Sequence, residues 1–275
     1  MPIVELLTPP PGDAYASEAA EQAQTYVDAF ARVGLTVRPR AWTDAGDAPA
    51  LALLAWGYHL HPERWAALLD SWPADVPLFN PAPLMRWNTR KTYLAELDAA
   101  GVPTVPTWFG DASARSVAAA FGWLGADELV VKPQVSAGSH ATYRVKRGED
   151  SPDVVDAMIQ PFLPAIQDEG EYSLFYIDGA FSHAICKVAT NGDFRIQPQF
   201  GGVNARWEPD EEAKDVAEAA LAAAPGEALY ARIDLLRRLD GHLALIEFEA
   251  IEPDLYFHHG EHVLDHLAEA VSARL

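Results

Sequence analysis

The sequence predicts an open α/β domain over about the first 85 residues, followed by an α+β region. In the first part, short apolar segments alternate with amphipathic helical segments, which is typical of a sheet with helical crossovers. In the second part, two pairs of strand-like segments are joined by Asp-Gly dipeptides, a strong signal for antiparallel hairpins. We therefore expect domains at 1–85 and 86–275.

In the first domain we expect strands at 2–8, 35–42 and 49–59 and helices at 17–33 and 61–72. Ser17 can cap the first helix, and Gly34 can end it. The segment 49–59 is a continuous apolar run, typical of a buried parallel strand. Pro62 suits the first turn of the second helix.

After residue 79, the proline-rich segment 80–88 reads as a linker. We expect helices at 89–101, 113–125, 213–226 and 262–275, and a helix running into an extended segment at 153–165. Segment 128–146 reads as two strands around a Gly/Ser loop. Hairpins are expected at 171–189, turned at Asp178-Gly179, and at 229–253, turned at Asp240-Gly241.

Composition restricts the partners. A net charge of −20 disfavours nucleic acid and anionic membranes, which attract basic surfaces. The longest apolar run, residues 50–57, is far shorter than a membrane-spanning helix, and the first residues lack the pattern of a secretory signal. The single cysteine, Cys186, excludes an intramolecular disulfide. We therefore expect a cytoplasmic protein.

The second hairpin suggests a metal site. If Asp240 and Gly241 are its two loop residues, Asp234 faces Glu247, and Glu249 lies two residues further along the same strand face. Three carboxylates together need protons, a cation or full solvation. Hard oxygen ligands of this kind suit Mg²⁺ or Mn²⁺. The alternatives are a solvent-facing acidic stripe or a one-residue register slip.

Cations and small residues suggest phosphate binding. Lys132 ends an apolar strand, and the loop after it contains Ser136, Gly138 and Ser139, whose small side chains let backbone N–H groups approach phosphate oxygens. An ordinary mobile turn is the alternative for this loop. Further candidate cations are Lys91, Lys187 and Arg195. Lys91, on a predicted helix, can equally be a solvated lysine.

The order of these motifs resembles the ATP-grasp superfamily, in particular the bacterial glutathione synthetase and RimK-type ribosomal-protein-S6-modification ligases. The resemblance covers residues 80–275 and rests on "RWNTRKTYLAELDAAGVPTVPTW", "LVVKPQVSAGSHATY", "IQPFLPAIQDEGEYSLFYIDGAFSHAICK", "DFRIQPQFGG" and "LYARIDLLRRLDGHLALIEFEAIEP". It implies a Rossmann-like pre-ATP-grasp domain, then an ATP-grasp fold with a mobile lid subdomain at about 111–158.

The resemblance also implies roles for individual residues. The ATP phosphates would contact Lys91, Lys132 and the lid loop with Ser136, Gly138 and Ser139, while Lys132 also borders the adenine. Gln160, Phe162 and Leu163 would bind adenine, and Glu171 the ribose. Lys187 and Arg195 would bind the transferred phosphate. Asp234, Glu247 and Glu249 would bind two Mg²⁺ ions, although many relatives have Asn at the last position.

The activity implied is ATP-dependent ligation of a small-molecule carboxylate to an amine through an acyl-phosphate, with release of ADP and phosphate. Intramolecular ring closure is one form of this chemistry. The alternatives are a phosphotransferase on the same scaffold and a non-catalytic nucleotide-binding regulatory module. Because relatives of this type often form dimers or tetramers, a homo-oligomer is also possible.

Candidate substrate residues follow the strands of the first domain, because open α/β sheets bind ligands at the carboxyl ends of their strands. Asp13 and Tyr15 follow the first predicted strand, and Tyr58 and His59 follow the third. Glu252 directly follows the predicted metal ligands and is a further candidate. The alternative for His59 is an ordinary loop or packing residue.

Overall fold

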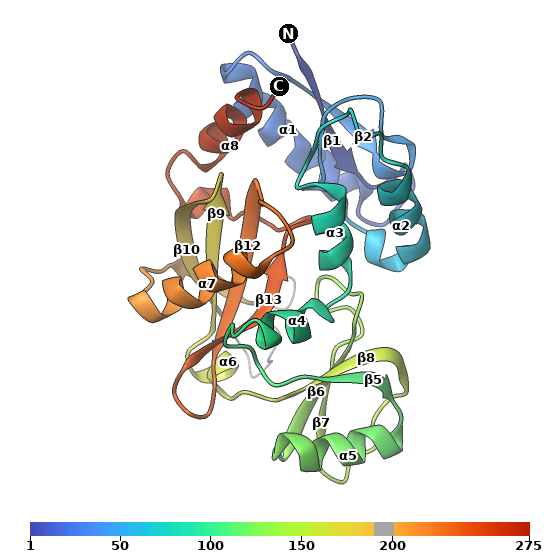
Figure 1. The fold of residues 1–275 in the computed structure, drawn as a ribbon, viewed down its shortest axis with the longest axis vertical. Coiled ribbons are helices and arrows are strands. Elements are labelled where there is room, and N and C mark those ends of the chain that lie inside the picture. The colour runs from blue at the N-terminus through green and yellow to red at the C-terminus, as the bar shows by residue number, and fades with distance from the viewer. Residues whose placement is uncertain (190–200) are drawn as a thin grey trace.

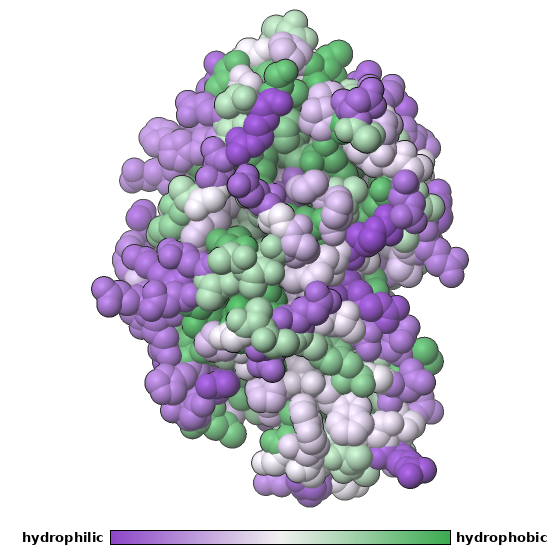
Figure 2. Space-filling view, viewed as in Figure 1, coloured by the Kyte–Doolittle hydropathy of each residue, from purple (hydrophilic) through white to green (hydrophobic). Residues whose placement is uncertain are grey.

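The structure is a computed structural model and describes residues 1–189 and 201–275. Figure 1 shows a parallel sheet near the two termini, a five-stranded sheet in the middle and a third sheet at the opposite end. In the space-filling view, hydrophilic residues line both flanks, with apolar residues interspersed between them (Figure 2). No helix in the described ranges is long and apolar enough to cross a membrane.

The first sheet is parallel, in the order β2-β1-β3-β4. Its strands are β1 (Ile3–Thr8), β2 (Thr36–Ala41), β3 (Ala50–Leu51) and β4 (Leu78–Phe79), and its helices are α1 (Ala16–Arg32) and α2 (Pro62–Ser71), with 3-10 turns η1 (Trp42–Asp44) and η2 (Tyr58–Leu60). Tyr15, not Ser17, stands at the N-cap of α1, and no side chain caps that end. Pro62 begins α2, as predicted.

The predicted strand at 49–59 is wrong beyond Leu51. Residues 52–57 are mostly in turns, and Gly57 has a φ of +82°. Residues 52–55 are nevertheless fully buried. The apolar run therefore reflects burial, which a turn inside the core satisfies as well as a strand does.

The predicted linker at 80–88 is also wrong, because it contains helix α3 (Ala82–Thr89), with Pro83 in its first turn. Proline is tolerated there, since the first helical N–H groups have no intrahelical acceptor. Asn80, before this helix, has a φ of +64°. Its Nδ2 donates to the carbonyls of Tyr230 (2.7 Å) and Ala250 (2.8 Å), so it fixes the start of α3 to the central sheet.

The third sheet is antiparallel, in the order β5-β8-β6-β7, and α5 packs on it around its own apolar core. The elements are β5 (Trp108–Ala112), α5 (Ala114–Leu124), β6 (Glu128–Pro133), β7 (Tyr143–Lys146) and β8 (Val154–Pro161). The helix predicted at 153–165 is wrong, because β8 occupies most of it. Strand β8 pairs with β5 on one side and β6 on the other, and this central position overrides the helical pattern.

The central sheet is antiparallel, in the order β11-β10-β9-β12-β13. Its strands are β9 (Glu171–Ile177), β10 (Ala180–Val188), β11 (Val203–Arg206), β12 (Tyr230–Arg237) and β13 (Leu243–Glu249). Helices α4 (Tyr93–Ala99) and α7 (Glu211–Ala223) share one apolar cluster with it. Helix α8 (Val263–Ser272) shares another with both this sheet and α1, so the last helix joins the central sheet to the first domain. A short helix, α6 (Ala165–Asp168), precedes β9, and a 3-10 turn, η4 (Phe257–His259), precedes α8.

Both predicted hairpins form, but the second differs in detail. Asp178 and Gly179 both have positive φ in the first turn, as a tight two-residue hairpin requires. In the second, the N–H of Arg238 donates to the carbonyl of His242, so the loop is one residue longer than predicted. A bulge at Ile246 compensates for the extra residue and restores the predicted facing of the carboxylates beyond it.

Candidate active site

Three carboxylates meet on one face of the β12–β13 hairpin. Asp234 faces Glu247, and Glu249 lies two residues further along β13. One oxygen from each of the three lies within 4.8 Å of the others. Asp234 is buried, while both glutamates are half-buried. The predicted cluster therefore forms, and it is not a solvent-facing acidic stripe.

Arg232 neutralises part of this cluster, a role that the sequence did not predict. Its Nε lies 3.0 Å from Asp234 Oδ1 and its Nη2 lies 2.9 Å from Asp234 Oδ2, and Nη2 also contacts Glu249. This planar two-point contact is the geometry that arginine favours with carboxylates. Without a metal ion, the guanidinium is the principal counter-charge for Asp234 and Glu249.

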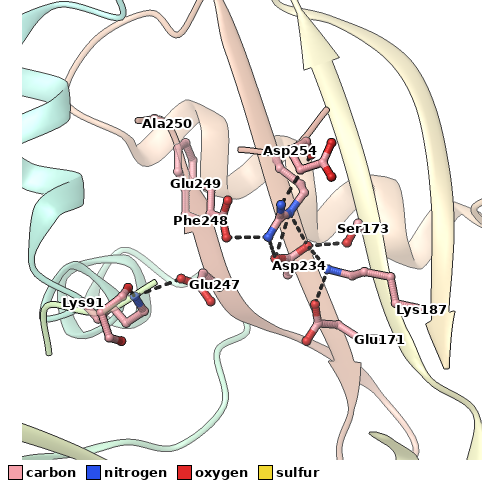
Figure 3. Close-up of polar contacts among 12 residues, drawn as sticks. Lys91, Glu171, Ser173, Lys187, Asp234, Glu247, Phe248, Glu249, Ala250 and Asp254 are labelled. Carbon is pink, nitrogen blue, oxygen red and sulfur yellow. Dashed lines mark hydrogen bonds and ion pairs between the residues drawn. The ribbon is translucent and has the colours of Figure 1, made fainter. Parts of the chain in front are cut away.

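Lys91 connects the carboxylates to the Gly/Ser loop. Its Nζ lies 3.0 Å from Glu247 Oε1 and donates to the carbonyl of Ser136 at 2.5 Å (Figure 3). The lysine is buried in the turn before α4, not on the helix predicted at 89–101, so it is not a solvated helix lysine. A buried ammonium between a carboxylate and a Gly/Ser loop is well placed to bind a phosphate.

A second buried ion cluster lies on the other side of Asp234. Lys187, on β10, places its Nζ 2.5 Å from Glu171 Oε1 and 3.3 Å from Asp234 Oδ1. Ser173 donates its hydroxyl hydrogen to Asp234 (Figure 3). Lys187 and Glu171 thus lie beside the carboxylate trio. Arg195 lies outside the described residues.

The surrounding charges shift the three carboxyl groups in opposite directions. Burial alone would raise the pKa of Asp234, but Arg232 and Lys187 lower it to about 2. Burial likewise opposes ionisation of Glu247, but Lys91 lowers its pKa. For Glu249, burial and the neighbouring carboxylates outweigh Arg232, so its pKa is well above the usual range. A divalent cation would relieve this repulsion.

The loop between β6 and β7 presents free backbone donors. Gly138 and Ser139 have φ values of +59° and +61°, and their N–H groups donate to no acceptor within 1–189 or 201–275. Ser136 is buried at the base of the loop, and Lys132 lies on β6. Burial lowers the pKa of Lys132, which the nearby Glu247 partly offsets. Free amides beside lysines are suited to phosphate oxygens.

An apolar cluster lies between the central and third sheets. Phe162 and Leu163, just after β8, belong to a cluster with Ile166, and Val130 and Ile246 pack against it. The predicted pair therefore lies at this junction, beside the strand that carries Lys132. Gln160 is buried, and its Nε2 donates to Thr107 Oγ1 at 2.9 Å.

The candidate substrate residues gather at the edge of the first sheet that faces the carboxylates. Asp13 Oδ1 accepts the N–H of Tyr15 at 2.9 Å, and the rings of Tyr15 and His59 are 6.2 Å apart. Burial raises the pKa of Tyr58, as do the charges of Glu252, Glu249 and Glu247. Burial raises the pKa of Glu252 to about 8 despite the nearby Lys91.

Comparison with known proteins agrees with this arrangement. No family model matches the chain. The cycloserine biosynthesis protein DcsG of Streptomyces lavendulae is 33% identical over 221 residues, which cover 72% of this chain and 73% of that protein. The crystal structure of D-cycloserine synthetase DcsG superposes with a TM-score of 0.83 at 27% identity, covering 99% of both chains.

Two more distant structures share the fold. D-alanine–D-alanine ligase from Bacillus anthracis has a TM-score of 0.71 at 15% identity, covering 100% of this chain and 99% of that one. The ATP-grasp ligase PsnB, complexed with minimal precursor, Mg and ADP, has a TM-score of 0.66 at 16% identity, covering 99% and 97%.

The three sheets, with lysines and carboxylates between them, define an ATP-grasp protein. The sequence identity to DcsG, which extends over most of both chains, identifies the family more narrowly than the fold does. The chain belongs to the family of ATP-grasp ligases that includes DcsG. The family resemblance seen in the sequence is thus confirmed, and the protein is an ATP-dependent ligase.

Proposed function

We propose that this enzyme joins a small-molecule carboxylate to an amine through an acyl-phosphate, releasing ADP and phosphate. The observation that carries the proposal is the position of Lys91. Its ammonium lies between Glu247 and the loop whose free amides can receive phosphate oxygens. This arrangement suits the transfer of a phosphoryl group, in which catalysis depends mainly on positioning and on charge.

The reaction has two steps. First, a carboxylate oxygen of the substrate bonds to the γ-phosphorus of ATP while the bond from that phosphorus to the bridging oxygen breaks, which releases ADP. Next, the amine nitrogen bonds to the acyl carbon, phosphate leaves with the former carboxylate oxygen, and the amine loses a proton. Lys91, Lys187 and Arg195 hold the transferred phosphoryl group, and no covalent bond to the enzyme is needed.

The carboxylate trio fits Mg²⁺. Its three oxygen donors come from one hairpin and lie within 4.8 Å of one another, and a divalent cation would offset the repulsion between Glu247 and Glu249. When bound, Mg²⁺ neutralises charge on the phosphates. We propose two ions held by Asp234, Glu247 and Glu249, and Mn²⁺ can substitute for Mg²⁺.

The nucleotide base and sugar have separate proposed contacts. Phe162 and Leu163 contact the adenine ring from the apolar junction, and Gln160 and Lys132 border it. Glu171 binds the ribose hydroxyls after Lys187 turns toward phosphate, because its carboxylate is occupied by that lysine without ligand. The segment 111–158 forms the lid, and Ser136, Gly138 and Ser139 close over the phosphates, which keeps water from the acyl-phosphate.

We propose that residues 1–85 form a Rossmann-like pre-ATP-grasp domain that selects the substrate, and that 86–275 form the ATP-grasp domain. Asp13, Tyr15, Tyr58, His59 and Glu252 contact the substrate. The name D-cycloserine synthetase, borne by a relative, supports ring closure within one small molecule as the form of ligation. The acidic surface and single cysteine support a cytoplasmic enzyme without a nucleic acid partner.

Product analysis tests the proposal. Amino acids and dipeptides are screened as carboxylates and amines in a coupled assay for ADP release. We expect ADP and phosphate in equal amounts, together with an amide. A stable phosphorylated product would instead support a phosphotransferase. ATP-induced thermal stabilisation without any turnover would support a regulatory module.

A further inference from the structure

His59 is buried without a hydrogen-bond partner. It lies in η2, after β3, with 8% of its surface exposed. Neither ring nitrogen has a partner in the part of the chain that the structure describes. Buried polar groups are nearly always paired, because an unmet donor or acceptor costs about 1–3 kcal/mol. The two bare nitrogens therefore point to a ligand.

His140, from the Gly/Ser loop, lies directly across from this ring. The centroids of the two imidazoles are 5.7 Å apart, and the rings are tilted by 55°. No hydrogen bond joins them. An oxygen at hydrogen-bond distance from a ring nitrogen lies about 4 Å from the ring centroid, so one ligand oxygen can reach both rings.

The charges around the pair favour an anionic oxygen. Burial is the largest influence that lowers the pKa of His59; His140, Lys91 and His61 add to it, and Asp13 opposes it. Tyr15 and Tyr58 place aromatic rings on other sides of the imidazole. A neutral imidazole offers one N–H donor, which an oxygen can accept, and the nearby Lys91 favours negative charge on that oxygen.

The Gly/Ser loop links His140 to Lys91, the lysine proposed to bind phosphate. At its base, the carbonyl of Ser136 accepts a hydrogen bond from Lys91, and four residues later His140 reaches the first domain. His140 is exposed, whereas His59 is buried.

We infer that His140 is a substrate-positioning residue that acts as a pair with His59, the two imidazoles holding one anionic oxygen between the first domain and the Gly/Ser loop. This inference rests on the proposed function. The oxygen belongs either to the substrate carboxylate or to the phosphoryl group that it accepts. Binding of that oxygen draws the loop onto the first domain and aligns the carboxylate for attack.

The test uses the full chain with ¹⁵N-labelled histidine and two simple probes. MgADP is added first, then either inorganic phosphate or acetate, and the imidazole ¹⁵N signals are followed. We expect the His59 and His140 signals to shift together with one probe, which identifies the source of the oxygen. Absence of a coupled shift with either probe would overturn the inference.

Variants supply the second arm. His140→Ala and His59→Ala should each lower the affinity for the probe that gave the coupled shift at least tenfold. The double variant should bind that probe no more weakly than either single variant, because the two rings hold one oxygen. His140→Gln, which keeps a donor, should recover part of the affinity. The exposed His266→Gln is the matched control and should bind as the wild type does.

Independent losses that add in the double variant would contradict the pair, as would normal affinity in both alanine variants. Thermal unfolding of each variant shows that it is folded. The MgADP step is scored separately. Failure to bind MgADP would therefore refute the nucleotide site and the proposed function, whereas normal MgADP binding without a histidine response would refute only the pair.

Discussion

Arg232→Met should strongly destabilise the ligand-free enzyme, and Mg²⁺ should restore much of the lost stability. The guanidinium is 11% exposed and makes bidentate contact with Asp234, which is 2% exposed, as well as contact with Glu249. Removing one partner of a buried pair leaves an uncompensated charge and costs about 3–5 kcal/mol. Methionine retains most of the side-chain volume, so the loss of stability comes from the missing charge and not from a cavity.

For a chain of this size, each kcal/mol shifts the Tm by roughly 2–4 °C, so a loss of 3–5 kcal/mol predicts a fall of about 6–20 °C in EDTA. The assay is thermal unfolding at a fixed scan rate, in EDTA and in millimolar Mg²⁺. Mg²⁺ should raise the Tm of the variant more than that of the wild type, because it takes the place of the missing cation.

The matched control is Arg206→Met, since the Arg206–Glu208 pair is more than half exposed on both sides and should contribute at most about 1 kcal/mol. If Arg232→Met unfolds within 2 °C of the wild type in EDTA, Arg232 is not the counter-charge of the trio. If Mg²⁺ stabilises both proteins equally, the ion does not bind at these carboxylates.

Two further predictions concern the packing and ionisation of the central sheet. Gly260→Ala should lower the free energy of unfolding in urea by about 1–3 kcal/mol, because the new Cβ would lie 2.6 Å from Val263 Cγ2. Gly122→Ala is the control: its Cβ meets nothing within 4 Å, so the substitution should be neutral or stabilising. Equal effects of the two substitutions would contradict the close contact at Gly260. Burial lowers the pKa of His183 to about 4 despite its hydrogen bond to a backbone carbonyl, so the unfolded chain, with a histidine pKa near 6.5, takes up the proton first. The contribution of the neutral His183 to the free energy of unfolding is fully present above pH 6.5 and falls by about 2–3 kcal/mol toward pH 4. His183→Gln should therefore flatten the dependence of the urea midpoint on pH between these values. An unchanged slope would refute the assignment.

Much of the candidate site was predictable because its residues sit on regular, local structure. Alternation along a strand places Glu247 and Glu249 on one face, and the Asp-Gly turn brings Asp234 opposite. The prediction was right for an incomplete reason, since the longer loop and the bulge at Ile246 offset each other. Neither feature has a signal in the alternation of apolar and polar residues.

The fold predictions failed where tertiary context overrides local pattern. The segment containing β8 has helical spacing of apolar residues but becomes an inner strand. The apolar run after Leu51 is buried as turns, because burial and strand formation share one sequence signal. The proline-rich segment before α4 forms a helix, since prolines at the first turn permit one.

The sequence missed two interactions, for different reasons. Arg232 lies two residues before Asp234 on the same strand, and its contact with that carboxylate depends on side-chain conformation, which strand alternation does not specify. His140 meets His59 through the packing of the loop against the first domain, at a sequence separation of about eighty residues. Arg232 and His140 both lie inside the stretches that carry the family resemblance, but the resemblance implies a role for neither.

The most direct test of the metal site is the Mg²⁺ dependence of ADP affinity in wild type and Glu247→Gln. Calorimetry measures ADP binding in Mg²⁺ and in EDTA, with the exposed Glu63→Gln as a control of equal charge change. Wild type and control should bind ADP at least tenfold more tightly with Mg²⁺, a difference of about 1.4 kcal/mol. Glu247→Gln should bind equally weakly in both, at the affinity of the wild type in EDTA. Retention of the full Mg²⁺ enhancement in Glu247→Gln would contradict the assignment of these carboxylates as metal ligands.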